Sequence, residues 1–151
     1  MNQNIWGPQM WFVLHTITFN YPIKPTETDK TNMNNFFLSL KPILPCMYCR
    51  KNYERHLKEK PIRLNSRKDL VYWLIDIHNE VNGQEGKKQY SYDEVLKIYS
   101  DKLNKKIDLD KTDSDVCDIH ANIYCLLMHY RDYIYIIIIL FLLFLVYKYY
   151  R

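Results

Sequence analysis

Apolar residues recur every three or four positions along most of this chain, which is the period of an amphipathic α-helix. The first stripe predicts a helix that begins at Trp6-Gly7-Pro8, with the proline in the first turn, and ends near Tyr21. Its inward-facing positions are Trp11, Leu14, Ile17 and Thr18.

A second and a third helix follow. Thr26 and Asp29 have the spacing of a capping box, with Asp in place of the usual Glu, and predict the start of the second helix. Pro42 is expected to end it, and the third helix is expected to run from about Cys46 to about Lys58. The apolar face of the second helix consists of Met33, Phe36, Phe37 and Leu40.

Cap-like starts predict two more helices. Ser66 precedes the fourth, which we expect to stop at Asn82-Gly83, and Ser91 forms a full capping box with Glu94 at the start of a short fifth. Helical spacing continues at Leu70, Trp73, Leu74, Ile77, His78 and Val81, and again at Val95, Ile98, Tyr99 and Lys102. No segment alternates as a strand does. The sequence therefore predicts an all-α fold, a bundle of four helices plus a short fifth.

The C-terminal third differs from the rest. Residues 104–115 are rich in Lys and Asp and have little to bury, which predicts a charged linker. Residues 116–130 carry an apolar stripe that is typical of an amphipathic helix. The stripe consists of Val116, Ile119, Ile123, Leu126, Leu127 and Tyr130.

The last residues are strongly apolar. The run from Tyr133 to Tyr147 has no charged residue and would span roughly 22 Å as a helix, against the ~30 Å hydrocarbon core of a bilayer. Tyrosines lie at both of its ends, as in aromatic belts, and Arg131 and Lys148 can reach the interface. A core helix of this composition would need apolar partners on every side, which so small a domain cannot supply. We therefore expect a C-terminal transmembrane helix over 131–151, after a helical domain that covers 1–103.

Composition narrows the functional classes. The 151 residues carry a net charge of +4 with basic and acidic residues intermixed, which favours a solvated surface and no nucleic-acid partner. Four cysteines are too few for a secreted disulfide scaffold of this length. The N-terminal residues have neither a basic region nor an apolar stretch, so no signal or transit peptide is expected.

The clearest chemical feature is Cys46-Met47-Tyr48-Cys49, preceded by Pro45. Thiols three positions apart at a helix start are favoured as thiolates by the helix dipole, and such pairs cycle between dithiol and disulfide. The same pair could be half of a zinc site, or two unrelated buried cysteines. The cysteines alone do not decide among these three interpretations.

Aromatic and polar side chains lie on otherwise apolar helical faces on both sides of this pair. Such a mixture can line a pocket for a large planar ligand with polar edges. The alternative is that Trp11 and Trp73 are core residues and that the histidines and asparagines are satisfied by backbone groups. The polar and aromatic residues in question are Trp11, His15, His78, Asn79 and Asn82.

Taken together, these residues resemble the FAD-linked sulfhydryl oxidases of the Erv/ALR family. The chain carries WGPxxWxxLH at 6–15, CxxC at 46–49 and HNxVN at 78–82, in the family's order and at compatible spacing. The resemblance covers about residues 5–99. It implies a four-helix bundle that binds FAD, with the isoalloxazine ring against the CxxC pair.

The resemblance also implies roles for single residues. Cys49 would be the flavin-proximal thiolate that forms a charge-transfer complex or adduct, and Cys46 the exposed partner that exchanges with substrate. Trp11 and His15 would come from the first helix, and Tyr99 stands where the family often has a tryptophan near the adenine. The adenosine and phosphates would be held by His78, Asn79, Val81, Asn82 and Lys87. The implied cofactor-binding set also includes Gly7, Pro8 and Cys49, and no metal ligand.

The chain departs from the family pattern in two respects. Where many members join the fourth and fifth helices by a structural disulfide, this chain has Ile75 and Tyr92, so apolar contact is expected to replace the bridge. The family's shuttle cysteines have only Cys117 and Cys125 as counterparts. In a continuous helix these two would lie ~12 Å apart along the axis, whereas a disulfide needs Cα atoms within ~7 Å, so we do not expect them to pair. Cys117, next to the linker, is the candidate for exchange or for a bridge between subunits.

The function implied by the resemblance is oxidation of protein dithiols to disulfides, with electrons passing through the CxxC pair and FAD to O2 and with hydrogen peroxide as product. A thioredoxin-like carrier is one candidate substrate, and a homodimer through the first two helices is expected. A C-terminal anchor without a signal peptide would leave the catalytic domain on the cytosolic side. The virion membrane of a large DNA virus is a candidate location.

Other functions remain open at this point. A thioredoxin-like reductase or isomerase needs a βαβ framework around its CxxC, and no strand is predicted. A zinc-binding module would use the CxxC pair with two of Cys117, His120 and Cys125, which lack the usual ligand spacing. The last alternative is a tail-anchored interaction protein with an incidental CxxC. Flavin absorbance of the purified chain would separate an oxidase from all of these.

Overall fold

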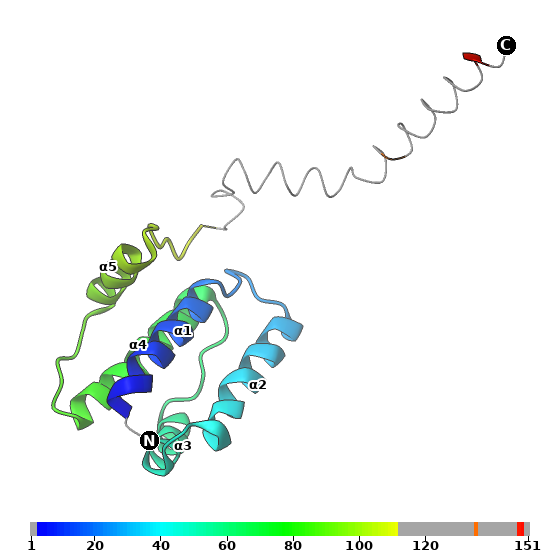
Figure 1. Ribbon diagram of the computed structural model, residues 1–151. Coiled ribbons are helices and arrows are strands. Elements are labelled where there is room, and N and C mark those ends of the chain that lie inside the picture. Colours follow the sequence, from blue (N-terminus) through cyan, green and yellow to red (C-terminus); the bar gives the residue numbers. More distant parts are fainter. Residues whose placement is uncertain (1–2, 112–134, 136–147, 150–151) are drawn as a thin grey trace. The chain divides into compact units, whose positions relative to one another are not determined.

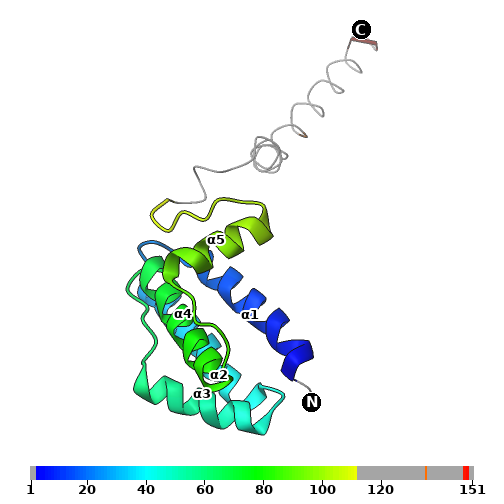
Figure 2. The ribbon, with the colours of Figure 1, turned by 90° about the vertical axis from the view of Figure 1, so that its left-hand side faces the viewer.

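A computed structural model of the chain describes residues 3–111, 135 and 148–149 (Figure 1). Regular structure in this part of the chain is entirely α-helical, as the apolar periodicity predicts, and no strand occurs in it. Helix α1 packs along α4, α2 packs against α3, and α5 contacts α4 (Figures 1 and 2). The helices of the compact unit are α1 (Gln3–Phe19), α2 (Glu27–Ile43), α3 (Met47–Glu59), α4 (Arg67–Gln84) and α5 (Tyr92–Leu103).

Side-chain caps mark the starts of three helices where the sequence predicts them. Thr26 and Asp29 form the reciprocal capping box of α2, and Ser91 and Glu94 form that of α5. Ser66 caps α4 by accepting a hydrogen bond from a backbone N–H three residues further on. These starts agree with the predictions because a cap is an interaction among residues that are close in the sequence.

Helix boundaries differ from the predictions in three places. α1 begins at Gln3, more than one turn before Pro8, so the proline lies inside the helix. α2 continues one residue past Pro42. α4 runs through Gly83, and the left-handed residue that follows it is Gly86, whose φ of 64° costs a glycine little.

The interior contains two apolar clusters. The first lies among α1 to α4 and includes Trp73, which is 1% exposed and donates from Nε1 to the backbone oxygen of Lys60 at 2.9 Å. The second involves α1, α4 and α5 and includes Ile75 and Tyr99. Trp73 is therefore a core residue, as the alternative interpretation of the tryptophans has it, whereas Trp11 only flanks the first cluster.

Ile75 and Tyr92, which stand at the positions of the family's structural disulfide, join α4 to α5 without a covalent bond. Ile75 is buried. Tyr92 stacks on Tyr72 with ring centroids 4.0 Å apart and planes 2° apart, and its hydroxyl donates to Asp76 Oδ1 at 2.8 Å. Apolar contact thus replaces the bridge as expected, and a hydrogen bond to a carboxylate, itself paired with Arg63, adds to it.

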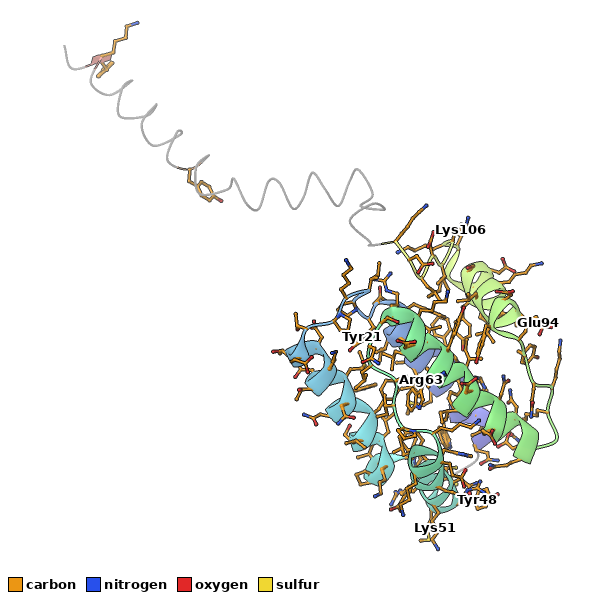
Figure 3. All side chains as sticks on the ribbon, turned by 180° about the vertical axis from the view of Figure 1, so that it is seen from behind. Tyr21, Tyr48, Lys51, Arg63, Glu94 and Lys106 are labelled. Carbon is orange, nitrogen blue, oxygen red and sulfur yellow. The ribbon has the colours of Figure 1, made fainter. Side chains whose placement is uncertain are left out.

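The chain after α5 corrects the predicted linker. Residues 104–111 belong to the compact unit, and Leu109 is buried in the second apolar cluster with Ile107 packed against it. Arg67, which is also buried, donates from Nε to the backbone oxygen of Tyr21 at 2.6 Å and from Nη1 to that of Lys111 at 2.7 Å. Tyr21, in the loop after α1, is labelled in Figure 3. The Arg67 guanidinium ties the loop after α1 and the segment after α5 to the start of α4. The composition of residues 104–111 does not reveal this packing, because two apolar side chains are enough to attach a segment that is otherwise charged.

The remaining sequence-based expectations fall elsewhere in the chain. The predicted helix at 116–130, with Cys117, His120 and Cys125, lies outside the described residues, as does most of the predicted anchor at 131–151. Within the residues that are described, no helix combines the length and the apolar character that crossing a membrane requires.

Candidate functional site

The two cysteines of the CxxC pair lie at the N-terminus of α3. Cys46 is the N-cap residue, its Sγ accepts a hydrogen bond from the backbone N–H of Cys49 at 3.2 Å, and both thiols are free. The adjacent Cys49 side chain, together with this backbone N–H, lowers the pKa of Cys46. Burial raises the pKa of Cys49 to about 11, and the neighbouring Cys46 side chain acts in the same direction. In the dithiol form Cys46 is therefore the more acidic of the two thiols and the better nucleophile.

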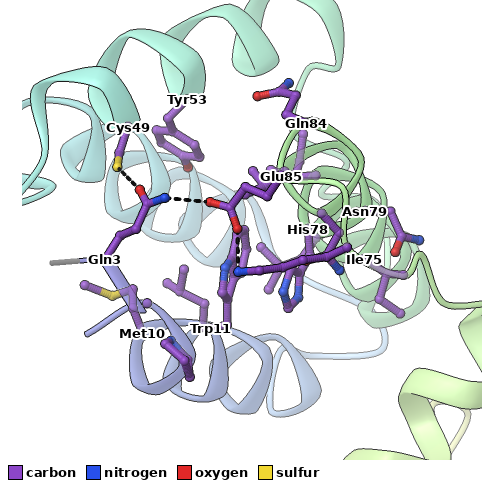
Figure 4. Close-up of a pocket in the computed structure, with 18 of the residues that line it drawn as sticks. Gln3, Met10, Trp11, Cys49, Tyr53, Ile75, His78, Asn79, Gln84 and Glu85 are labelled. Atoms are coloured by element: carbon purple, nitrogen blue, oxygen red, sulfur yellow. Dashed lines mark hydrogen bonds and ion pairs between the residues drawn. The ribbon is translucent and has the colours of Figure 1, made fainter. Parts of the chain in front are cut away.

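A cavity of about 690 Å³ lies beside Cys49, and all five helices of the compact unit contribute to its wall (Figure 4). Cys46 is not part of that wall, so the pair connects the cavity with a second, partly exposed thiol. The sequence-predicted cofactor residues that line the cavity are Gly7, Pro8, Trp11, Cys49, His78, Asn79, Val81, Asn82, Lys87 and Tyr99.

His15 belongs to the predicted set but lies behind the cavity wall. It is fully buried, and its Nε2 is 3.1 Å from Nδ1 of His78, which does line the cavity. Trp11 stacks on the same His78 ring, with centroids 3.9 Å apart and planes 8° apart. Burial is the main cause that lowers the pKa of His15 to about 3 and that of His78 to about 4. Both imidazoles are thus neutral at pH 7, and His15 positions the stacked pair on the wall.

Asn79 fixes the segment that follows α4. Its Nδ2 donates to the backbone oxygen of Tyr90 at 2.8 Å, and its Oδ1 accepts from the backbone N–H of the same residue at 2.9 Å. The amide is thus satisfied by backbone, as the alternative interpretation expects, although it borders the cavity. Its contribution is to hold the 85–90 segment, with Lys87 and Lys88, against α4.

Lysine side chains give part of the cavity wall a positive charge. Lys87, Lys88 and Lys102 all border the cavity, and Lys87 pairs with Glu85 at 2.5 Å. After burial, the charge of Lys87 is the largest cause of the lowered pKa of His78, and Lys102 adds to it. Cations beside a stacked aromatic pair suit a ligand that has both phosphates and a planar ring.

Several cavity residues escaped the sequence-based prediction. The face of α3 that begins at Cys49 continues at Asn52, Tyr53 and His56, and extending the helical spacing along α3 could have found them. Gln3 was missed because α1 was expected to begin later. The other unpredicted wall residues include Trp6, Met10, Gln84, Glu85, Lys88, Tyr90, Ile98 and Lys102.

No group of three or more His, Cys, Asp or Glu side chains in the described part of the chain is arranged to hold a metal ion. The further zinc ligands considered above, Cys117, His120 and Cys125, lie outside that part.

Comparisons with known proteins show which family this chain resembles. The Erv1/Alr family matches residues 8–101. A probable FAD-linked sulfhydryl oxidase of Acanthamoeba polyphaga mimivirus is 42% identical over 109 residues, which cover 70% of this chain and 76% of the relative. An FAD-linked sulfhydryl oxidase of African swine fever virus is 33% identical over 108 residues, 72% of this chain and 91% of the relative.

Solved structures show the same relationship. The crystal structure of the FAD-binding domain of Erv1 from Saccharomyces cerevisiae matches with a TM-score of 0.64 and 30% identity, covering 67% of this chain and 96% of that domain. The yeast Erv1 core matches with a TM-score of 0.63 and 26% identity over 72% of this chain and 88% of its own. This chain belongs to the Erv1/Alr family.

Proposed function

We propose that this protein is an FAD-dependent sulfhydryl oxidase, which oxidises protein dithiols to disulfides and passes the electrons to O2, with hydrogen peroxide as product. The position of the two thiols carries the proposal. Cys49 borders the cavity and Cys46, its N-cap partner, does not, so a disulfide between them would connect the cavity with a sulfur that substrates can attack. The viral relatives, which are named FAD-linked sulfhydryl oxidases, support the same assignment.

The cavity fits FAD in size and in chemistry. Its volume of about 690 Å³ lies within the range of ~300–1,000 Å³ that is typical of cofactor sites. Trp6 borders it, and the buried Nε1 of this residue has no hydrogen-bond partner among the described residues. Lys87 and Lys102 would pair with phosphates, and the Trp11–His78 stack would contact a planar ring. When bound, FAD accepts two electrons from a thiol pair and transfers them to O2.

The chain's own part of the reaction is thiol–disulfide exchange at Cys46. A substrate thiolate attacks Sγ of Cys46 in the Cys46–Cys49 disulfide, forms a mixed disulfide with Cys46 and releases the sulfur of Cys49. The second substrate thiolate attacks the substrate sulfur of that mixed disulfide, and Cys46 leaves. The lowered pKa of Cys46 makes it the better leaving group in this second step. The substrate dithiol thereby loses two electrons and two protons, and the cysteine pair gains them.

The purified full-length chain provides the test. We expect it to bind one FAD per chain, with flavin absorbance, and to consume O2 when given dithiothreitol or a reduced protein, with one hydrogen peroxide formed per dithiol. A folded chain that binds no FAD and consumes no O2 would contradict the proposal. Thiol exchange without O2 uptake would favour a CxxC exchange protein instead.

We also propose that residues 131–151 anchor the enzyme in a membrane, with the catalytic domain on the cytosolic side. The uncharged, tyrosine-flanked run in the sequence supports an anchor. Because the relatives compared above are enzymes of viruses, the virion membrane is a candidate location. Protease added to intact microsomes should digest the N-terminal domain. Full protection of that domain would contradict this topology.

We further propose a homodimer through α1 and α2 that acts on protein dithiols, with a thioredoxin-like carrier as one substrate. Such an interface would cover the exposed apolar side chains of Val13 on α1 and Leu38 on α2, which are 49% and 44% exposed. Val13→Glu should convert the dimer to a monomer in sedimentation experiments while FAD stays bound. A monomeric wild-type chain would rule the interface out.

If the protein is a dimer, non-reducing gels test whether a disulfide joins its subunits. Loss of the covalent dimer in Cys117→Ala, with the covalent dimer kept in Cys125→Ala, would identify Cys117 as the bridging thiol.

A further inference from the structure

His56 is a buried cavity residue with one ring nitrogen unpaired. It lies on α3, is 1% exposed, and its side chain borders the cavity. Its Nε2 is 3.2 Å from Nε2 of Gln84, an amide nitrogen that can only donate. Nε2 of His56 is therefore the acceptor, and in the neutral ring the proton is on Nδ1. Nδ1 has no hydrogen-bond partner among the residues that the structure describes.

A second amide agrees with the direction of this contact. Nδ2 of Asn52 donates to Oε1 of Gln84 at 3.2 Å, and in this arrangement the nitrogen of the Gln84 amide lies toward His56. Burial is the main cause that lowers the pKa of His56, and the charge of Arg55 acts in the same direction, so the ring is neutral at pH 7. Asn52 thus donates a hydrogen bond to Gln84, and Gln84 donates one to His56. The last donor in this series is the N–H at Nδ1 of His56, which has no acceptor among the described residues.

The other polar side chains on the cavity face of α3 are already engaged. The hydroxyl of Tyr53 donates to the backbone oxygen of Phe37 at 3.0 Å, and the thiol of Cys49 donates to Oε1 of Gln3. A buried N–H without an acceptor is costly, and a ligand that supplies the acceptor removes that cost. Cys49 and His56 are seven residues apart, so they share one face of α3 about 10.5 Å apart along its axis.

We propose that His56 is a further cofactor-binding residue, whose Nδ1–H donates a hydrogen bond to an acceptor atom of FAD in this cavity. Asn52 and Gln84 are positioning residues that hold the imidazole in this donor tautomer. The inference rests on the proposed function, because it requires FAD as the occupant. FAD suits the donor, since its flavin ring system carries carbonyl oxygens and ring nitrogens that accept hydrogen bonds.

Two substitutions of His56, by residues of similar size, test the roles of its two ring nitrogens separately. The amide nitrogen of an asparagine can take the place of Nδ1, whereas the longer side chain of a glutamine reaches the position of Nε2. FAD is titrated into the FAD-free full-length chain and followed by flavin fluorescence. We expect His56→Asn to bind within about 3-fold of wild type and His56→Gln to bind about 10-fold more weakly. Lys58→Gln, on the exposed side of α3, is the control and should bind as wild type does.

The ring proton itself gives a readout that does not depend on activity or affinity. With 15N-labelled histidine, long-range 15N–1H correlations distinguish the two neutral tautomers, and we expect the proton of His56 on Nδ1. Its resonance should move and its exchange with water should slow when FAD is added.

Three outcomes would overturn the inference. The first is a proton on Nε2. The second is no change at His56 when FAD binds. The third is equal loss of FAD affinity in both variants, in proportion to their loss of thermal stability without FAD, which would make His56 a purely structural residue. A wild-type chain that does not bind FAD would contradict the proposed function itself, and this inference with it.

Discussion

The thiol of Cys49 in α3 donates a hydrogen bond to the side-chain oxygen of Gln3 in α1, with Sγ and Oε1 3.5 Å apart (Figure 4). Nε2 of Gln3 in turn donates to Oε1 of Glu85 at 3.0 Å. Because a carboxylate can only accept, Glu85 fixes the amide with its oxygen toward Cys49. An acceptor beside a thiol favours the protonated form, and the charge of Glu85 also raises the pKa of Cys49, after the larger effects of burial and of Cys46.

We expect the two thiols of the reduced, FAD-free chain to react with iodoacetamide at different pH. At pH 8 a thiol with a pKa of about 11 is ionised in about one molecule in a thousand, whereas the pKa of Cys46 lies below its ordinary value. Cys46 should therefore be alkylated at least ~10-fold faster than Cys49, as measured by peptide mass spectrometry. Equal rates would contradict the assignment of Cys46 as the nucleophile.

The same measurement tests the role of Glu85. Glu85→Gln removes the negative charge and lets the amide of Gln3 turn, so the pH midpoint for alkylation of Cys49 should fall. Glu59→Gln, at the far end of α3, is the matched control and should leave that midpoint unchanged. A midpoint that stays in place in both variants would mean that burial and Cys46 alone set the pKa of Cys49.

Serine substitutions should separate the roles of the two cysteines. Cys46→Ser and Cys49→Ser should each keep FAD bound and lose at least ~100-fold of the oxidase activity, because either change removes the exchangeable disulfide. Only Cys46→Ser leaves a thiol on the cavity wall, so with FAD bound only this variant should show long-wavelength charge-transfer absorbance, which should grow as the pH is raised and Cys49 ionises. The reverse spectral pattern would exchange the proximal and distal assignments.

The contact between Tyr92 and Tyr72 should stabilise the attachment of α5. Tyr92→Phe keeps the ring stack but loses the hydrogen bond to Asp76, for a loss of ~1 kcal/mol in the free energy of unfolding. Tyr92→Ala loses both, for ~2–3 kcal/mol, and should also weaken FAD binding because α5 contributes Tyr99 to the cavity wall. Urea denaturation with and without FAD measures both effects. Equal stability of the two variants would show that the stack contributes nothing.

Stability should fall as the pH is lowered from 7 to 5. Burial depresses the pKa of His15 to about 3 and that of His78 to about 4, so in this range the unfolded chain binds protons at these sites that the folded chain does not. The free energy of unfolding has its full contribution from these histidines above pH ~6.5, the pKa of histidine in the unfolded chain. It decreases as the pH falls toward the pKa values of the folded chain, and at pH 5 the loss is about 2 kcal/mol for each histidine. His78→Gln should flatten the dependence measured by urea denaturation. An unchanged slope would mean that His78 binds protons equally in the folded and the unfolded chain.

Local signals predicted much of the fold and of the cavity. The capping boxes at Thr26 and Ser91 were readable because both partners lie within four residues. The start of α1 could not be predicted in this way, because Gln3 is held by Cys49 and Glu85, which are far away in the sequence. The family resemblance identified wall positions on α1, α4 and α5.

The family resemblance did not identify His56, again because its contacts are with residues that are far away in the sequence. The proposed role of His56 depends on its contact with Gln84, which in turn contacts Asn52. A contact between α3 and α4 does not alter the spacing of apolar residues in either helix, so the sequence does not reveal it. Asn79 shows the converse case. The motif placed it at the cavity, but only the coordinates show that its amide is occupied by Tyr90.

The buried guanidinium of Arg67 sets a lower limit on the length of a fragment that can be expressed and crystallised. A fragment that stops at Leu103 would lose the backbone oxygen of Lys111 and the apolar cover of Leu109. A buried charged donor left without its acceptor costs ~2–3 kcal/mol, a large share of the stability of a small domain. The catalytic fragment suitable for crystals therefore ends at Lys111 or later, and not at the last turn of α5.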